Sequence, residues 1–215
     1  MMQNTSQTIC LAIILFFLTS CGPLYRTIFG IKKVAPREES TLKRFLLKTG
    51  CDTTDVYAVD SKEWQRLFNE GLPNKRVPEI MVFDRQGRYI PYAEVGKWIC
   101  LGEVDPFIAS LTDTGQYHIS DFTTLERELS GLRALNGSYP AVADSTHDFV
   151  VLAYWAYFLG GNLARNNLPG WEQDAAGNTR ARIRLIKVSL DPQLWWKPEH
   201  LEQLKRGKSS FSFKR

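Results

Sequence analysis

Two cysteines in the middle of the chain are the side chains whose chemistry is easiest to recognise. Cys51 and Cys100 stand 49 residues apart, and neither belongs to the C-x-x-C spacing that thiol–disulfide exchange favours. A disulfide between them would stabilise the fold by about 4 kcal/mol in the chain-entropy model. The spacing leaves three interpretations open: a structural disulfide, two buried free thiols, or a pair that acts together in catalysis.

The histidines and a tryptophan pair are the next candidates. His118, His147 and His200 are scattered, and none has a second histidine or a cysteine at the spacing of metal ligands. We therefore expect solvated positions for all three, and the sequence predicts neither a metal nor another cofactor. The pair Trp195-Trp196 favours core packing by one ring and partial exposure of the other over a ligand platform.

The composition is that of a globular domain. The 215 residues are 44% hydrophobic and 23% charged, which excludes a disordered chain. The formal net charge is only +4, and basic residues at the C-terminus supply more than this excess: Lys205, Arg206, Lys208, Lys214 and Arg215. We therefore expect no nucleic acid partner. Neither a G-x-G-x-x-G nor a P-loop motif occurs, so nothing predicts a nucleotide site.

The N-terminus has the pattern of a targeting signal. Residues 9–18 form an uncharged apolar run, shorter than the roughly 20 residues of a membrane-spanning helix and typical of a signal peptide. The run ends in Leu18-Thr19-Ser20-Cys21-Gly22, which resembles the bacterial lipobox. This resemblance implies that residues 1–20 are a signal peptide. It also implies that Cys21 is lipidated, with palmitate among the acyl chains, and becomes the first mature residue.

A lipid on Cys21 predicts a protein anchored to the bacterial cell envelope rather than one that spans a membrane. Gly22 is followed by no acidic run, so the resemblance to lipoproteins implies the periplasmic face of the outer membrane rather than the inner membrane or surface display. Residues 1–8 carry no Lys or Arg, unlike most signal peptides. A buried N-terminal helix with an incidental cysteine is therefore the alternative.

Hydrophobic periodicity divides the rest of the chain into alternating helices and strands. Residues 21–37 are expected to form a tether and residues 206–215 a basic, solvated tail. The expected helices cover residues 38–49, 60–70, 105–111, 121–135 and 161–175, and a last one starts at residue 198. The expected strands cover residues 55–59, 77–83, 88–92, 148–158 and 182–190.

This alternation predicts an α/β fold with a mixed sheet flanked by helices. We expect one domain over residues 38–205, built from the halves 51–111 and 121–205. In the second half, Asp121 is predicted to cap its helix, and Glu126 and Glu128 are predicted to face solvent there. Pro169 is expected to bend the helix that contains it.

The segment from Phe149 to Asp191 resembles the core of thioredoxin-like proteins. It has a buried strand, the Trp155-Ala156 pair, a four-residue turn, a helix, and a strand that ends in Asp191. The C-x-x-C of that family would fall on Leu159-Gly160-Gly161-Asn162, where both cysteines are absent.

A second segment, residues 54–111, resembles the other half of the same fold. Val77-Pro78-Glu79 matches the strand that the family opens with a cis-proline, which implies that Pro78 is cis. In that family the hairpin half normally follows the half with the Trp-Ala pair. The resemblance therefore implies a thioredoxin-like arrangement whose element order is permuted or duplicated.

The function expected from this resemblance is binding rather than catalysis. Without sulfur at Leu159 or Asn162, the family's disulfide chemistry is not expected. We expect a binding or scaffolding lipoprotein whose groove near Pro78 and Phe158 accepts a protein or peptide segment by main-chain pairing. The alternative is an atypical thiol–disulfide oxidoreductase that uses the two central cysteines. A third possibility is a structural envelope component whose basic tail from Lys205 contacts anionic lipid or glycan.

Overall fold

Seven strands form one mixed sheet in the computed structural model, which describes residues 32–70, 72, 77–93, 103–139, 146–159 and 161–205. The strands are β1 (Val56–Val59), β2 (Glu79–Asp84), β3 (Arg88–Ile90), β4 (Ser120–Thr124), β5 (Leu132–Ala134), β6 (Phe149–Trp155) and β7 (Ile183–Ser189). Their order across the sheet is β4-β3-β2-β6-β7-β1-β5. The prediction of an α/β fold with a mixed sheet is confirmed.

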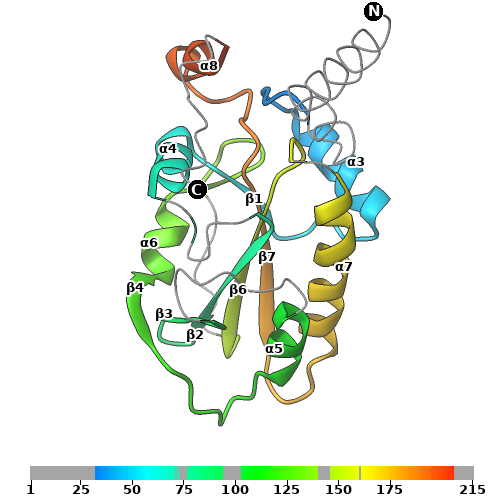
Figure 1. Cartoon of the computed structure of the whole chain (residues 1–215), viewed down its shortest axis with the longest axis vertical. Helices are drawn as coiled ribbons and strands as arrows, with labels where there is room; N and C mark the ends of the chain where they lie inside the picture. Colours follow the sequence, from blue (N-terminus) through cyan, green and yellow to red (C-terminus); the bar gives the residue numbers. More distant parts are fainter. Residues whose placement is uncertain are drawn as a thin grey trace, which may run out of the picture.

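The described helices cover both faces of this sheet. They are α3 (Glu39–Thr49), α4 (Ser61–Glu70), α5 (Val104–Ser110), α6 (Leu125–Ser130), α7 (Gly161–Gly177) and α8 (Pro198–Lys205). Figure 1 shows α3, α5 and α7 along one face and α4 and α6 along the other. Helix α7 runs through Pro169 without ending there. In the described part of the chain, no helix combines the length and the apolar character needed to cross a membrane.

Strand β6 is buried on both faces, which explains its continuous apolar sequence. Val151, Ala153 and Trp155 belong to the core beneath α3, α5 and α7. Leu152 and Tyr154 belong to the core beneath α4 and α6. Because successive side chains of a strand point to opposite faces, a strand between two helical layers needs apolar residues at nearly every position.

The neighbours of β6 come from both halves of the chain. On one side β7 is parallel, from Phe149↔Ile183 to Trp155↔Ser189, and α7 makes the crossover. On the other side β2 is antiparallel, from Glu79↔Tyr154 to Asp84↔Phe149. Strand β1 extends the parallel part beyond β7. Elements of the halves 51–111 and 121–205 therefore alternate within one sheet.

The helix predicted from Asp121 is wrong, since three short elements take its place. Residues 120–124 form the edge strand β4, which pairs with β3. Thr124, rather than Asp121, caps the shorter helix α6, because its Oγ1 accepts a hydrogen bond from Arg127 N at 3.3 Å. Leu132, expected on the helix, begins β5 beside β1. Pairing with strands distant in sequence thus outweighs the local helical periodicity.

Candidate functional site

The parallel strands β6, β7 and β1 end at the same side of the sheet, where α/β proteins commonly bind ligands. Two loops meet there, residues 156–159 after β6 and residues 190–193 after β7. Residues 32–37, which we call the strap, lie against both loops. We call the two loops together the motif edge.

A buried carboxylate holds the first of these loops in place. Asp191 is fully buried, and its Oδ2 accepts hydrogen bonds from Tyr157 N at 2.7 Å and from Ser189 Oγ at 3.1 Å. Its Oδ1 accepts one from Phe158 N at 3.2 Å. The end of β7 therefore fixes the backbone of the turn that follows β6.

The environment of Asp191 disfavours its charged form. Burial raises the pKa of its carboxyl group to about 6. The hydrogen bonds from Tyr157, Ser189 and Phe158 act in the opposite direction, as does the positive charge of Arg37. Desolvation outweighs them, because a carboxylate removed from water loses more than these donors restore.

The strap contacts the motif edge through its backbone and through two cations. Lys32 N donates to Phe158 O at 2.7 Å, and Arg37 N donates to Pro192 O at 2.8 Å. The Lys32 ammonium lies 3.5 Å from the centroid of the Tyr157 ring, and the Arg37 guanidinium lies 4.9 Å from the same centroid. The last part of the segment predicted as a tether, residues 32–37, is therefore packed on the domain.

Pro78 adjoins the same edge from the other side of β6. The Val77–Pro78 peptide bond is cis, the isomer expected from the sequence. The next residue, Glu79, pairs with Tyr154 in the ladder, so Pro78 stands level with the end of β6. Glu79 is fully buried, and its Oε1 accepts a hydrogen bond from Tyr92 Oη at 2.6 Å.

The predicted motif positions lie where β6 leads into α7. Leu159 is half-buried in the turn, and Gly161 is the first residue of the helix. Asn162 belongs to the first turn of α7. Gly160 lies outside the described residues, as does the predicted lipidation site Cys21.

Cys51 follows α3 and is buried, with 2% of its surface exposed. It is a free cysteine, and its predicted partner Cys100 lies outside the described residues. Burial raises the pKa of the Cys51 thiol, with a further contribution from the nearby Glu172 carboxylate. Less of the thiol is therefore ionised at neutral pH, which weakens it as a nucleophile.

A buried lysine stands beside Cys51. Lys187 is 2% exposed, and its Nζ donates to Asp52 Oδ1 at 2.7 Å and to Glu172. Burial alone would lower the pKa of Lys187, but hydrogen bonds to these two carboxylates outweigh it and raise the pKa. The lysine therefore stays charged and joins α7 to the loop after α3, which is a structural role.

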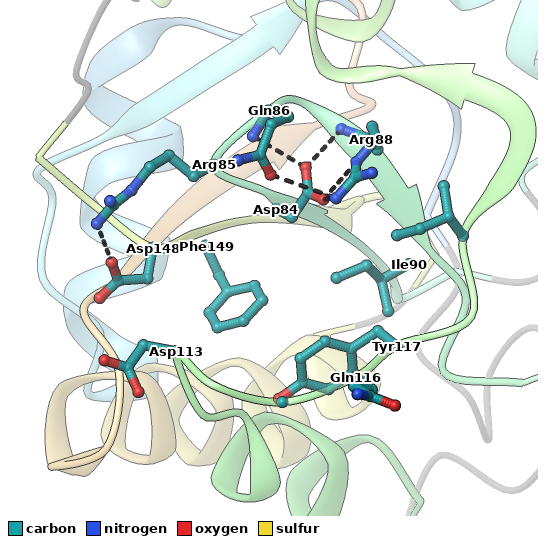
Figure 2. A pocket seen from close by; sticks show the side chains of 12 residues that line it. Asp84, Arg85, Gln86, Arg88, Ile90, Asp113, Gln116, Tyr117, Asp148 and Phe149 are labelled. Carbon is teal, nitrogen blue, oxygen red and sulfur yellow. Dashed lines mark hydrogen bonds and ion pairs between the residues drawn. The ribbon is translucent and has the colours of Figure 1, made fainter.

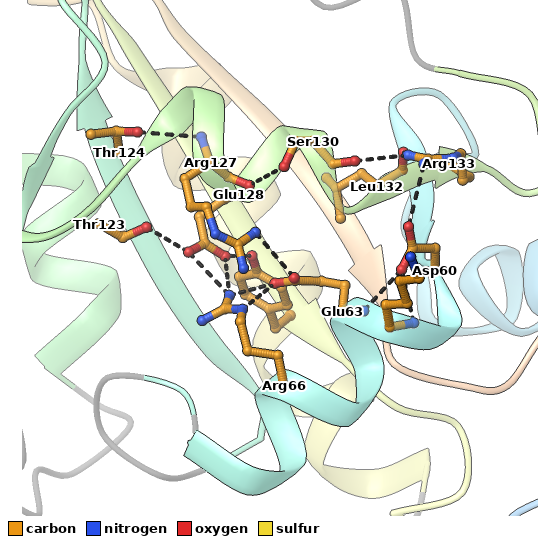
Figure 3. A network of polar contacts seen from close by, with 12 residues as sticks. Asp60, Glu63, Arg66, Thr123, Thr124, Arg127, Glu128, Ser130, Leu132 and Arg133 are labelled. Atoms are coloured by element: carbon orange, nitrogen blue, oxygen red, sulfur yellow. Dashed lines mark hydrogen bonds and ion pairs between the residues drawn. The ribbon is translucent and has the colours of Figure 1, made fainter.

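A network of buried polar groups joins α4 and α6 to the sheet (Figure 3). Glu128 is 1% exposed and accepts hydrogen bonds from Thr123 Oγ1 at 2.7 Å and Tyr154 Oη at 3.1 Å. The Arg66 guanidinium lies 3.0 Å from its Oε2. Burial and the Glu128 carboxylate raise the pKa of the Tyr154 phenol well above its usual value, so the phenol remains a donor.

The second carboxylate of the network comes from α4. Glu63 is 5% exposed; it pairs with Arg66 on its own helix and with Arg127 of α6 at 3.2 Å. A Cβ atom at Gly131 would lie 2.5 Å from Glu63 Cγ, so glycine makes room for this side chain. The network therefore fixes two helices against each other, and its two carboxylates, Glu63 and Glu128, are buried.

The prediction that Glu126 and Glu128 both face solvent is half wrong. Glu126 is exposed, whereas Glu128 is buried. Residues two apart on a helix point in different directions, and Glu128 points toward Arg66, whose helix is distant in sequence. The sequence pattern of α6 alone does not contain this contact.

The opposite end of β6 borders a cavity of about 510 Å³. Figure 2 shows charged residues of the β2–β3 turn on one side, Tyr117 on the other and Phe149 between them. Two pairs of these charges are ion pairs within the chain: Arg88 lies 2.7 Å from Asp84, and Arg85 pairs with Asp148. Among the described residues no three side chains are grouped as metal ligands.

The prediction for the tryptophan pair is confirmed. Trp196 is buried and its Nε1 donates to Val59 O at 3.2 Å, while Trp195 is half-buried. Of the three histidines expected at solvated positions, His118 is exposed, and His147 and His200 are half-buried.

No family model, curated protein or solved structure matches this chain.

Sequence reasoning located part of the motif edge and missed the rest. It placed the turn at Leu159 and the proline at Pro78, because both carry local patterns. The sequence predicts Asp191 only as the end of a strand, although an acidic residue directly after a buried strand is a signal for a buried carboxylate. It read the strap as a free tether, because the contacts of Lys32 and Arg37 depend on loops that are distant in sequence.

Proposed function

We propose that this protein is a lipid-anchored, thioredoxin-like binding module of the bacterial envelope, which has lost the family's redox chemistry and retains a site for an extended polypeptide. The observation that carries the proposal is the geometry of the motif edge. Leu159 follows β6, Asn162 lies in the first turn of α7, and Pro78 stands level with the end of β6.

The strand order supports a permuted thioredoxin-like arrangement. The hairpin of β2 and β3, the central β6 and the crossover strand β7 are adjacent in the sheet in that family's spatial relation, with the hairpin antiparallel and the crossover parallel. Helix α5 follows the hairpin and contacts α7 on the same face. In the sequence, however, the hairpin comes before β6, which is the permutation.

The residues of the turn support a binding role rather than a redox role. Neither Leu159 nor Asn162 has a sulfur atom, so no thiolate is available at the start of α7. The alternative oxidoreductase would have to use Cys51 and Cys100. Cys51 is buried with a raised pKa, which is the opposite of the exposed, low-pKa thiol that disulfide exchange requires.

Restoring the missing cysteines tests the assignment of the turn. We expect the double substitution Leu159→Cys/Asn162→Cys to create a reversible disulfide with a potential between about −120 and −270 mV, and to reduce a disulfide-linked peptide. The physical reason is that the N-terminus of α7 stabilises a thiolate. The measurement is redox titration and substrate reduction by the full chain in detergent, with Cys51 and Cys100 replaced by alanine.

The matched control is Glu199→Cys/Glu202→Cys, which places two cysteines at the same spacing in the first turns of α8, a helix that does not follow β6. We expect the graft at the turn to reduce the peptide at least about tenfold faster than this control. Equal rates would show that the turn has no thioredoxin-like substrate site.

A second experiment tests the anchor. We expect Cys21→Ser to abolish incorporation of radiolabelled palmitate and to leave residues 1–20 attached, because the sulfur that carries the lipid is gone. The control is Cys10→Ser, which lies inside the apolar run and should keep the label and the processed mass. Palmitate on the Cys21→Ser protein would contradict the proposal.

A further inference from the structure

We infer that the motif edge binds an extended basic peptide, and that the strap is an intramolecular copy of that ligand. This inference rests on the proposed function and names the class of its ligand. A piece of polypeptide, residues 32–37, already lies against the two loops, so its contacts show what this surface accepts.

The backbone contacts of the strap define its conformation. It is bonded at both ends, through Lys32 N to Phe158 O and through Arg37 N to Pro192 O. Arg37 also forms a parallel bridge with Gln193. None of residues 32–36 belongs to a helix or a strand. An incoming segment that repeats these bonds must therefore run across both loops of the motif edge in an extended form.

The side chains of the strap define the chemistry of the ligand. Lys32 and Arg37 both lie over the ring of Tyr157, where the negative face of the aromatic system attracts a cation. Tyr157 is itself held by Phe45 of α3, with ring centroids 5.2 Å apart in an edge contact. The positive charge of Arg37 also acts on the buried carboxylate of Asp191. An acidic segment would gain neither of these attractions.

The apolar part of the strap is short. Val34 is half-buried and packs against the core that β6 shares with α4 and α6. Lys33 is exposed, and among the described contacts only its carbonyl is used, by Arg37. The structure thus specifies a ligand with a cation at each end, spaced as Lys32 and Arg37 are, and one aliphatic side chain between them.

Because the strap belongs to the same chain, it competes strongly with any free ligand. A segment tethered by a short linker has an effective concentration of the order of millimolar. A partner of the same chemistry binds only when its concentration or affinity is high enough to displace the strap, or when the contacts of the strap are weakened. The intact chain should therefore bind a free strap peptide poorly, and a chain with a disabled strap should bind it well.

The test uses a fluorescein-labelled peptide with the sequence of residues 30–38, GIKKVAPRE, and the full chain in detergent micelles. Fluorescence anisotropy should show binding by the Lys32→Ala/Arg37→Ala chain at least about tenfold tighter than by the wild-type chain. The matched control Lys33→Ala changes an exposed lysine of the same segment and should behave as wild type. A peptide with glutamine in place of Lys32 and Arg37 should not bind.

Equal affinity of the wild-type and Lys32→Ala/Arg37→Ala chains for the peptide would overturn the inference, and so would binding of the glutamine peptide as strongly as the basic one. A second measurement needs no variant. Millimolar peptide added to the wild-type chain should displace the strap and so speed hydrogen exchange at the amides of Lys32 and Arg37. Unchanged exchange would show that the basic peptide does not take the place of the strap. The Leu159→Cys/Asn162→Cys variant tests the turn independently of the strap. If that variant is active but the basic peptide does not bind, the proposed ligand class is wrong and the proposed function still stands.

Discussion

Replacing Glu128 by alanine is expected to lower the free energy of unfolding by about 3 kcal/mol. The side chain is 1% exposed and accepts hydrogen bonds from Thr123, Tyr154 and Arg66. Its removal leaves the hydroxyl groups of Thr123 and Tyr154 without this acceptor and takes one carboxylate from Arg66. Unsatisfied buried polar groups of this kind cost about 1 to 3 kcal/mol each. Arg66 still has its ion pair with Glu63. The expected loss of unfolding free energy is therefore at the lower end of the range for a broken buried ion pair.

Urea titration of the full chain, followed by tryptophan fluorescence, measures this loss. The matched control is Glu126→Ala, which removes an exposed carboxylate from the same helix and should change the free energy of unfolding by less than about 0.5 kcal/mol. Glu128→Gln should fall between the two, since its amide oxygen still accepts a hydrogen bond. The role assigned to the network is wrong if Glu128→Ala and Glu126→Ala unfold at the same urea concentration.

The second large effect is a change of stability with pH that depends on Asp191. Burial raises the pKa of Asp191 to about 6 from an ordinary value of 3.8, so between these two pH values the folded protein binds a proton that the unfolded chain does not. The stabilisation from this group is therefore complete below pH 3.8 and is lost as the pH rises through about 6. The difference of pKa corresponds to about 3 kcal/mol.

Comparison of wild type with Asp191→Asn isolates this contribution. When the pH is lowered from about 7 to about 4, the free energy of unfolding of wild type should rise relative to that of Asp191→Asn by most of about 3 kcal/mol, because the amide does not titrate. Changes from other groups cancel in the difference. Asp113→Asn, at an exposed position, should follow wild type throughout. Parallel curves of stability against pH for wild type and Asp191→Asn would show that the carboxyl group has no raised pKa.

Local patterns predicted the central part of the fold. The apolar run of β6, the glycines and periodicity of α7 and the hairpin around Asp84 to Gly87 are all determined by residues close in sequence. They sufficed to predict the turn at Leu159 between β6 and α7. The α/β class and the mixed sheet follow from the same patterns.

Contacts between distant segments could not be predicted in the same way. Asp191 binds backbone amides 33 and 34 residues earlier, and no periodicity encodes such a bond. Glu128 is buried because Arg66 reaches it from another helix. The strand β4 replaces the helix expected from Asp121 because β3 offers it hydrogen bonds. In each case the deciding partner is a tertiary neighbour rather than the local sequence.

The alternation of the two halves within one sheet determines the order in which the chain can fold. Strands β1 and β2 emerge first during synthesis, yet their neighbours toward the centre of the sheet, β7 and β6, both belong to the C-terminal half of the chain. Pairing at such separation requires closure of long loops before any contact is gained, which slows folding. While the N-terminal half leaves the ribosome, β2 can pair with β3, but neither β1 nor β2 has its neighbour toward the centre of the sheet. No truncated chain that ends before β7 completes the sheet.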